Sequence, residues 1–432
     1  MAEPLATGRA DHVTEPRRLS HLVARLTGKW NLQRLAAIEE KVVKFGRAQR
    51  EELAAQREAI GQLATSLPTR ASAASVHELQ RRMEDLQRSF AHQDRAFADA
   101  FERARLLDEQ GTDDRRFARR IGELLRHDRP IVVGPWTGEV GFELLYWVPF
   151  VRWVVNTYGI APDRLLVVSR GGVSSWYGGL AARYADVFSY FSPDEFRVAT
   201  EDAKKQRLVG KFDTVVLKRV LAAHNLDRAD LLHPGMMYRL FMPFWREIAP
   251  MSRIGQYATH GRIEATDDPV LRDLPDNYVA ARFYFSGCFP ETAANRAHVE
   301  SIVDTVSRQL PVVLLNTPFA VDDHRDMPVA GGRVLTVGAA HMAPERNLAV
   351  QTAVIARARA FVGTYGGYSY LAPFCGVPSM AFYSAQTFKA HHLHAAQHVF
   401  EHLGDARLVP LDVATLPLAR LALSNTLGNT TP

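Results

Sequence analysis

From residue 130 onward, short apolar runs alternate with stretches whose apolar residues recur every three or four positions. The short runs predict strands and the periodic stretches predict helices. The expected strands are Ile131–Val133, Arg164–Ser169, Thr214–Leu217, Tyr278–Phe285, Pro311–Asn316, Arg333–Val337, Ala360–Gly363 and Ser379–Tyr383. The expected helices are Phe142–Trp153, Thr292–Arg308, Leu348–Ala358 and Tyr370–Phe374, and Pro149 is expected to kink or divide the first of them. Strands that alternate with helices predict parallel sheets covered on both faces.

Apolar residues before residue 130 recur at heptad spacing instead. A weak seam runs up to Pro68, which ends its helix, and Ala71–Ser75 forms a small-residue hinge. A seam of this length needs a partner surface, so we expect self-association into a homo-oligomer. The alternatives are a helical pair packed back onto the core, or a partly ordered tail. The main seam comprises Leu79, Met83, Leu86, Phe90, Gln93, Phe97, Ala100, Ala104 and Leu107.

These patterns predict three regions in an α/β chain. Residues 1–127 form a helical, coiled-coil-like arm, 128–265 a first Rossmann-like doubly wound lobe, and 266–432 a second one. The boundary between the lobes is expected near Arg262–Pro275. A length of 432 residues exceeds the usual size of a single domain and agrees with this division.

Composition narrows the possible classes. The apolar share of 47% and the charged share of 23% are typical of a soluble, core-forming protein. The net charge of +5 is spread along the chain without a polybasic cluster, which favours an anionic ligand or a membrane surface over nucleic acid. Two cysteines, Cys288 and Cys375, indicate a reducing compartment. We therefore expect a cytoplasmic protein, with peripheral binding at the inner membrane as an open alternative.

Two glycine-containing loops follow expected strands, where doubly wound sheets bind their ligands. The first loop, Gly134–Gly141, contains Gly138 and Glu139, and its glycines allow close backbone approach to a ligand. Glu139 could act as a general base or could simply favour the following helix N-terminus, and the sequence leaves both open. Glu143, one helical turn later among apolar residues, is expected to be structural.

The second loop runs from Thr364 through Gly366 and Gly367 to Ser369. Its small residues precede a short helix, and backbone N–H groups together with the Thr364 and Ser369 hydroxyls suit a diphosphate. The loop does not fit Gly-x-Gly-x-x-Gly, and no P-loop lysine follows it, which disfavours dinucleotide oxidoreductases and P-loop enzymes.

The stretch Phe361–Phe382, with its Gly376-Val377-Pro378 strand entry, resembles the donor-binding segment of GT-B glycosyltransferases. Its layout is similar to that of heptosyltransferases and bacterial polysaccharide glycosyltransferases, and the resemblance covers Arg129 to about Leu423. It implies a GT-B type fold whose first lobe holds the acceptor and whose second lobe holds a nucleotide-diphosphate sugar. The glutamate motif of the retaining groups is missing near Pro344–Asn347, which favours an inverting mechanism.

The same resemblance implies roles for individual residues. Glu139 would be the base, and Arg282 would contact the diphosphate, with a strand-face salt bridge as the alternative for Arg282. Arg170 could contact the diphosphate from the first lobe. No metal and no cofactor beyond the nucleotide-sugar co-substrate is expected, because Asp267-Asp268 and Asp322-Asp323 are adjacent pairs in polar turns rather than Asp-x-Asp motifs.

Two further groups of side chains allow more than one interpretation. Five histidines cluster after the last expected strand, and three of them share a helix face, so metal binding is possible but surface or nucleotide-facing positions are favoured. Trp136 and Trp176 lie in or near loops and could stack on a sugar ring, whereas most first-lobe aromatics are expected in the core. The histidines are His391, His392, His394, His398 and His402.

The function that fits best is transfer of a sugar from a nucleotide-sugar to an acceptor hydroxyl, in bacterial surface glycan synthesis with a glycan or glycolipid acceptor. A nucleotide-sugar epimerase of the same fold is one alternative, although it would need several acid/base groups and the sequence places only Glu139. A non-catalytic coiled-coil assembly protein is the other.

Overall fold

The computed structural model describes residues 111–201, 206–321, 324–404 and 407–415, together with isolated positions between 51 and 95. The chain divides into two units, residues 1–112 and 113–432. The described positions between 51 and 95 are helical and exposed, and Glu78 forms ion pairs with Arg81 and Arg82 at helical spacing. The predicted heptad seams, Pro68, the hinge at 71–75 and Asp322-Asp323 lie outside the described residues.

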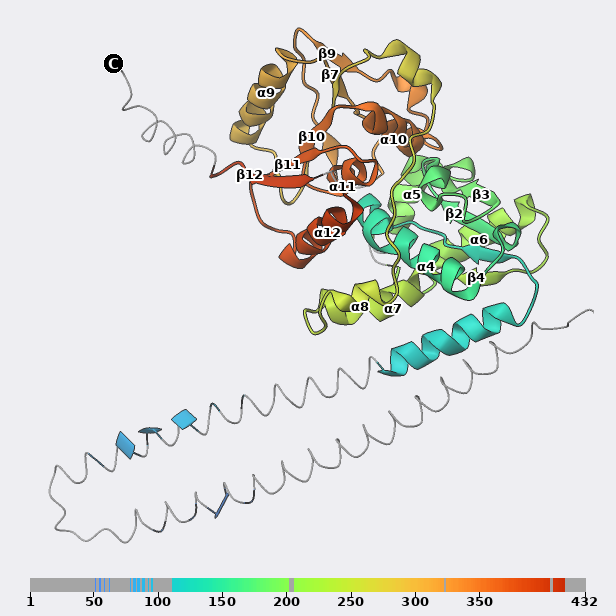
Figure 1. The fold of residues 1–432 in the computed structure, drawn as a ribbon, viewed down its shortest axis with the longest axis vertical. Coiled ribbons are helices and arrows are strands. Elements are labelled where there is room, and N and C mark those ends of the chain that lie inside the picture. The colour runs from blue at the N-terminus through green and yellow to red at the C-terminus, as the bar shows by residue number, and fades with distance from the viewer. Residues whose placement is uncertain are drawn as a thin grey trace, which may run out of the picture. The chain divides into compact units, whose positions relative to one another are not determined.

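A four-stranded parallel sheet organises the first lobe (Figure 1). Its order is β3-β2-β1-β4, and Ile131 pairs with Leu165 on one side and with Asp230 on the other. The strands are β1 (Ile131–Val133), β2 (Leu165–Ser169), β3 (Arg183–Asp186) and β4 (Asp230–Leu232). The helices are residues 111–125, α3 (Val140–Phe142), α4 (Val148–Tyr158), α5 (Pro193–Thr200), α6 (Lys211–Ala223), α7 (Pro234–Trp245) and α8 (Ser252–Gly255).

A six-stranded parallel sheet organises the second lobe in the order β12-β11-β10-β5-β7-β9, and a separate antiparallel pair joins β6 to β8. The strands are β5 (Val279–Arg282), β6 (Tyr284–Phe285), β7 (Val312–Leu314), β8 (Arg325–Asp326), β9 (Val334–Thr336), β10 (Ala360–Thr364), β11 (Ser379–Tyr383) and β12 (Leu408–Asp412). The helices are α9 (Ala293–Ser307), α10 (Asn347–Arg357), α11 (Gly367–Phe374) and α12 (Ala390–Leu403).

The central strands of the two sheets, such as β1, β2 and β10, are buried on both faces, which explains their uninterrupted apolar runs. In β1, Ile131 and Val133 face the central core, whereas Val132 faces a separate cluster with residues of α5 and α6. In β10, Phe361 faces the central core and Val362 faces the cluster beneath α9. The central core includes side chains from both sheets, so the two lobes share apolar packing.

The strand orders identify where each sheet reverses direction. The parallel strands of the second lobe, numbered along the chain, follow the doubly wound order 3-2-1-4-5-6, and the first sheet follows its first part, 3-2-1-4. The reversal lies between β1 and β4 in the first lobe and between β5 and β10 in the second. Ligands of doubly wound sheets bind beyond the carboxyl ends of the strands at such switch points.

Most of the expected elements are confirmed, but one is wrong. Residues 214–217, expected as a strand, lie inside α6, where Val216 and Val220 are buried one turn apart. The Asp213 carboxylate accepts a hydrogen bond from the Gly210 N–H at 2.7 Å, and this cap begins a helix despite the β-branched residues. The strands β3, β4 and β12 are present in addition to the expected ones, so Ser379–Tyr383 is not the last strand. The boundary between the two lobes at residue 265 stays a prediction.

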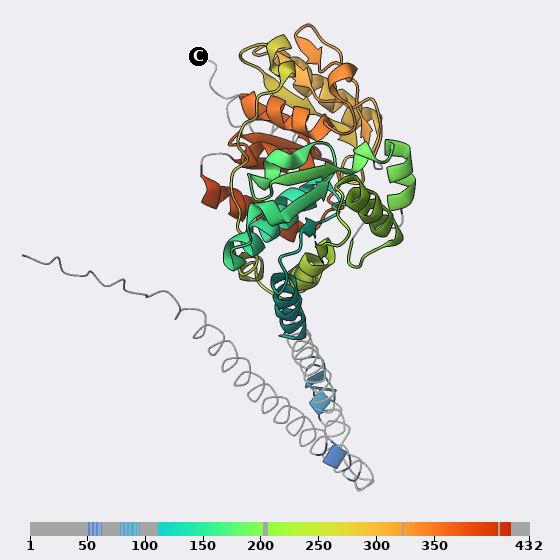
Figure 2. The same ribbon diagram turned by 90° about the vertical axis from the view of Figure 1, so that its right-hand side faces the viewer.

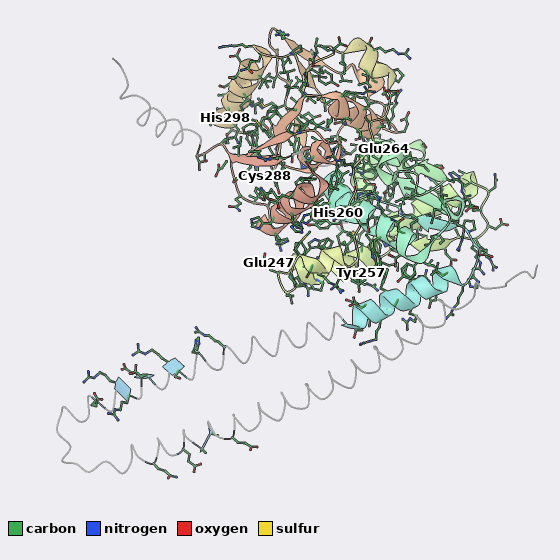
Figure 3. All side chains as sticks on the ribbon, viewed as in Figure 1. Glu247, Tyr257, His260, Glu264, Cys288 and His298 are labelled. Carbon is green, nitrogen blue, oxygen red and sulfur yellow. The ribbon has the colours of Figure 1, made fainter. Side chains whose placement is uncertain are left out.

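The helix expected over Phe142–Trp153 is present but contains a π-helical turn, Glu143–Trp147. Pro149 lies in the first turn of α4 and has no N–H to donate to the Leu145 carbonyl. The half-buried His260, which Figure 3 labels, supplies that hydrogen bond: its Nε2 lies 3.0 Å from the Leu145 carbonyl oxygen. A donating Nε2–H is compatible with neutral imidazole, and burial lowers the pKa of His260 to about 4.

Several contacts join the two lobes, which lie against one another in both views (Figures 1 and 2). The Gly171 carbonyl accepts a hydrogen bond from the Ala349 N–H at 2.9 Å, and Trp176 Nε1 donates to Thr352 Oγ1 at 2.9 Å. From the second lobe, α12 reaches back so that His392 Nδ1 lies 2.7 Å from the Tyr146 hydroxyl. Among the described residues, none of the helices combines the length and hydropathy that a membrane span requires.

Candidate functional site

The two glycine-containing loops predicted from the sequence meet in space. Gly134–Gly141 follows β1 and Thr364–Ser369 follows β10, so each lies at the switch point of its sheet. A Cβ atom placed on Gly367 would lie 2.7 Å from the Gly141 nitrogen and 2.9 Å from the Val140 Cβ. No side chain fits at that distance, so these two glycines allow the lobes to touch through their backbones.

A cavity of about 330 Å³ opens beside this contact and is lined by both lobes. Gly138, Glu139 and Arg170 contribute from the first lobe, and His324 from the second. Glu201 places a second carboxylate on the wall. The cavity therefore combines acidic and basic groups at the junction of the lobes, in the position expected for a substrate pocket between two doubly wound sheets.

Glu139 occupies the N-cap position of α3, but its side chain makes no capping hydrogen bond. The residue is exposed and lines the cavity. The general-base role of Glu139 and its electrostatic effect on the helix N-terminus both stay predictions.

Arg170 and Glu143 form a buried group behind Glu139. The Arg170 guanidinium donates through Nη2 to the Gly138 carbonyl, and its Nε has no hydrogen-bond partner among the described residues. Glu143 accepts hydrogen bonds from Ser169 Oγ at 2.5 Å and from the Tyr177 hydroxyl at 2.8 Å. Burial raises the pKa of Glu143 to about 7, although Arg170 opposes the shift. Arg170 is thus fixed to the first loop and faces the cavity.

In the second loop, the hydroxyl groups are engaged within the protein. Thr364 Oγ1 accepts from the Tyr284 N–H at 3.0 Å and donates to the Tyr284 carbonyl at 2.9 Å. Ser369 Oγ likewise donates to the Gly366 carbonyl at 2.7 Å. These bonds fix the shape of the loop and leave the first-turn N–H groups of α11 as the diphosphate donors to be tested.

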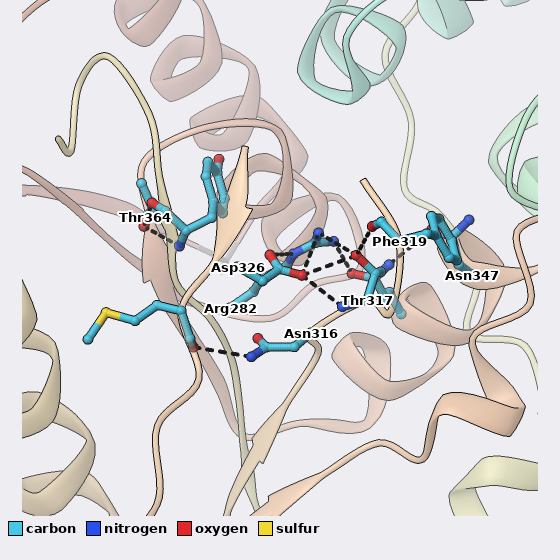
Figure 4. A network of polar contacts seen from close by, with 10 residues as sticks. Arg282, Asn316, Thr317, Phe319, Asp326, Asn347 and Thr364 are labelled. Carbon is cyan, nitrogen blue, oxygen red and sulfur yellow. Dashed lines mark hydrogen bonds and ion pairs between the residues drawn. The ribbon is translucent and has the colours of Figure 1, made fainter. Parts of the chain in front are cut away.

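Arg282 lies at the carboxyl end of β5, beside the second switch point, and is buried in a polar network (Figure 4). Its Nε and Nη2 contact the two Asp326 oxygens at 3.0 and 3.2 Å, and its Nη1 donates to Gln351 Oε1 at 2.7 Å. The guanidinium also lies 4.1 Å from the centre of the Tyr368 ring. The contact of Arg282 with a diphosphate stays a prediction. The salt bridge, which is the alternative role of Arg282, is present with Asp326.

The structure also places the tryptophans and histidines that the sequence singled out. Trp136 and Trp176 are fully buried, Trp136 between Trp147 and Tyr238, so the idea that they stack on a sugar is wrong. Of the clustered histidines, His391 contacts Glu247, which Figure 3 labels, at 3.1 Å. In the described ranges, histidine, cysteine and acidic side chains form no group of three or more that could hold a metal ion.

Sequence reasoning missed several residues of the site. Glu201 and His324 were not considered, because they lie on parts of the chain without a recognisable motif. His324 stacks on Tyr284, with ring centres 4.5 Å apart, which links the cavity wall to the second loop. Asp326, the partner of Arg282, lies on a two-residue strand that periodicity cannot detect.

Comparisons with known proteins give a distant likeness to glycosyltransferases of solved structure. The chain is similar to a glycosyl transferase family 9 protein from Veillonella parvula, with 13% identity, coverage of 70% of this chain and 90% of that one, and a TM-score of 0.38. It is also similar to ADP-heptose LPS heptosyltransferase II of E. coli, with 11% identity, coverage of 69% and 98%, and a TM-score of 0.37. The glycosyltransferase SnogD from Streptomyces nogalater gives 12% identity, coverage of 70% and 95%, and a TM-score of 0.28. No protein-family model and no curated protein matches the chain.

Proposed function

We propose that the chain transfers a glycosyl group from a nucleoside-diphosphate sugar to an acceptor hydroxyl. The observation that carries this proposal is the contact between the two switch-point loops, with a cavity lined by both lobes beside it. A doubly wound sheet offers a nucleotide site at its switch point, and here the loop after β1 of a second such sheet touches that point and carries the carboxylate of Glu139. The donor binds at the second lobe and the acceptor enters from the first.

In this reaction Glu139 removes the proton from the acceptor hydroxyl. The acceptor oxygen forms a bond to the anomeric carbon while the bond from that carbon to the diphosphate breaks, and the nucleoside diphosphate leaves. Direct displacement of this kind inverts the anomeric configuration. Arg170 lies beside Glu139 and stabilises negative charge in the cavity, so the proposed step needs no metal.

On the donor side, the N-terminus of α11 with Gly366, Gly367 and Ser369 holds the diphosphate. Arg282, Thr364 and their hydrogen-bond partners keep this loop and the segment at Thr317 in place. The acceptor belongs to a surface glycan or its lipid-linked precursor on the cytoplasmic side, and the arm brings copies of the chain together.

A second candidate function follows from the additional groups in the cavity. Glu139, Glu201 and His324 provide several acid/base groups around one space, which an epimerase acting on a nucleotide-sugar requires. Such an enzyme would change a stereocentre of the donor without needing an acceptor. Product analysis separates the two reactions. Sugar transfer releases the nucleoside diphosphate, whereas epimerisation yields a product in which it is still attached to the sugar.

The first test combines binding with turnover. Purified chain is screened by thermal shift against UDP, GDP and ADP and against UDP-glucose, GDP-mannose and ADP-glucose, because a ligand of the folded state raises the melting temperature. The sugar conjugate that binds is then assayed for release of its diphosphate. We expect Glu139→Gln to keep the thermal shift and to lower turnover about a hundredfold or more.

Glu300→Gln is the matched control, since it makes the same change at an exposed position of α9 that does not line the cavity. It should retain turnover close to that of the parent chain. If none of the nucleotides at millimolar concentration raises the melting temperature, the glycosyltransferase proposal fails and the assembly-protein alternative takes its place.

A further inference from the structure

A hollow lined by several arginines lies away from the candidate active site. A groove of about 430 Å³ runs between helix 111–125, the loop before α6 and the N-terminus of α7. Five arginines and two carboxylates line it. We call this surface the arginine groove; its lining includes Arg116, Arg119, Arg120, Arg207 and Arg239.

The two carboxylates of the groove are already paired. Asp113 lies 3.6 Å from Arg116, and Glu123 lies 3.1 Å from Arg120. For Arg119, Arg207 and Arg239, no carboxylate of the described ranges lies within ion-pair distance. All three residues are exposed. The groove therefore presents uncompensated positive charge and fits an anionic partner.

Two aliphatic side chains stand at the edge of the same groove. Leu208 is 68% exposed and Val209 is 50% exposed, and the cations Arg207 and Lys211 flank them. Single exposed apolar residues are common, but here two adjacent ones accompany unpaired arginines. The combination is amphipathic, with apolar side chains beside cationic ones.

This exposure is built into the fold. Before the pair, the buried Gln206 accepts a hydrogen bond from the Thr137 N–H at 2.9 Å and donates to the Pro135 carbonyl at 2.8 Å. After it, Asp213 holds the Gly210 N–H and also accepts from Gln206 at 2.9 Å. Both ends of the short loop are fixed, so Leu208 and Val209 remain on the surface.

We propose that the arginine groove docks the protein on an anionic lipid bilayer, with Leu208 and Val209 entering the interface beside the headgroup phosphates. A bilayer offers phosphates and acyl chains at adjacent depths, which matches arginines beside an aliphatic loop tip. A nucleic acid would satisfy the arginines but would leave the two aliphatic side chains without an apolar partner. The docking surface does not depend on the transfer reaction, and it can be tested separately.

The test measures sedimentation of the full chain with vesicles of phosphatidylcholine, with and without phosphatidylglycerol. We expect binding that requires phosphatidylglycerol and weakens with salt. The double variant Leu208→Asp/Val209→Asp should bind about tenfold more weakly or worse, because the apolar insertion is lost. Arg119→Glu and Arg239→Glu should each weaken binding about fivefold or more.

Matched controls make the same chemical changes elsewhere. Leu335, on β9 of the second lobe, is 42% exposed, and Arg272 of the same lobe is exposed and does not line the groove. Leu335→Asp and Arg272→Glu should bind vesicles like the parent chain. Because all the altered side chains are exposed, we expect unchanged melting temperatures, and this is checked for each variant.

A second measurement reports insertion directly. Tryptophan at position 208, introduced as Leu208→Trp, should be quenched by brominated phospholipid in anionic vesicles, whereas Leu335→Trp should not. The proposal is overturned if the full chain ignores anionic vesicles, or if both groove variants bind as well as the parent. It is also overturned if only the arginine variants lose binding, since the groove would then be a site for a soluble polyanion or an acidic protein.

Discussion

Two titratable side chains at the π-helical turn, the buried Glu143 and the half-buried His260, respond to pH in opposite directions. Glu143 belongs to the turn, and His260 donates to its Leu145 carbonyl. Burial raises the pKa of Glu143 to about 7 and lowers the pKa of His260 to about 4. For each side chain there is therefore a pH range in which it is neutral in the folded protein but ionised in the unfolded chain.

For Glu143, the raised pKa means that stability is greatest below the ordinary glutamate pKa and decreases as the pH rises through about 7. The variant Glu143→Gln cannot ionise. We expect its free energy of unfolding to exceed that of the parent by about 3 kcal/mol above pH 7 and to match it near pH 4. Urea denaturation across this range measures the difference.

The exposed Glu201→Gln should show no such pH-dependent difference. A Glu143→Gln variant that is less stable than the parent at pH 8 would contradict the prediction, since Glu143 would then be ionised and stabilised by Arg170 in the fold.

For His260, the lowered pKa gives the opposite sign. The unfolded chain takes up a proton below about pH 6.5 while the folded chain does not, so stability decreases as the pH falls from there towards 4. We expect the parent to lose about 3 kcal/mol over this window relative to His260→Gln, which does not titrate. The exposed His127→Gln is the control, and parallel stability curves for parent and His260→Gln would refute the assignment.

At the scale of elements, the contact between α3 and α11 depends on two glycines. A Cβ on Gly367 would meet backbone and Cβ atoms of the first lobe at under 3 Å, so Gly367→Ala must displace one loop. We expect it to lower the free energy of unfolding by about 1–3 kcal/mol, the usual cost of overpacking. Gly332→Ala, which meets nothing within 4 Å, should have a much smaller effect in the same urea titration. Equal losses in both variants would show that the close approach is unimportant.

The elements that the sequence predicts well are those buried on both faces. Ile131–Val133 and Ala360–Gly363 are apolar at successive positions because each strand packs against two layers. The strands β3 and β4 were missed because they are short and carry charges, such as Asp186 and Asp230. Residues 214–217 were misread because tertiary packing and the Asp213 cap outweigh the strand preference of valine and threonine.

At the scale of the whole molecule, the sequence predicts the two loops but not that they contact one another in the fold. Gly134–Gly141 and Thr364–Ser369 are recognisable by their glycines after a strand. That Gly141 contacts Gly367, and that His324 joins Glu139 at one cavity, depends on how the lobes pack. Periodicity carries no information on contacts between residues more than 180 positions apart, so these parts of the site had to come from the structure.

The shared packing of the lobes leads to a last prediction about cooperativity. The central core includes β1 and β10, and hydrogen bonds such as that of Trp176 with Thr352 cross the junction. Unfolding one lobe alone would expose this common apolar surface to water, which is unfavourable. We therefore expect both lobes to unfold in one transition, with the same urea midpoint.

The chain supplies a separate probe for each lobe. Outside the arm, every tryptophan lies before residue 246, and both cysteines, Cys288 and Cys375, lie in the second lobe. In a Trp30→Phe background, tryptophan emission reports the first lobe and pulsed thiol labelling reports the second. Coincident midpoints are expected. Labelling that appears at clearly lower urea than the emission change would show that the second lobe unfolds alone, and the junction would then be too weak to hold the two switch points together without a bound donor.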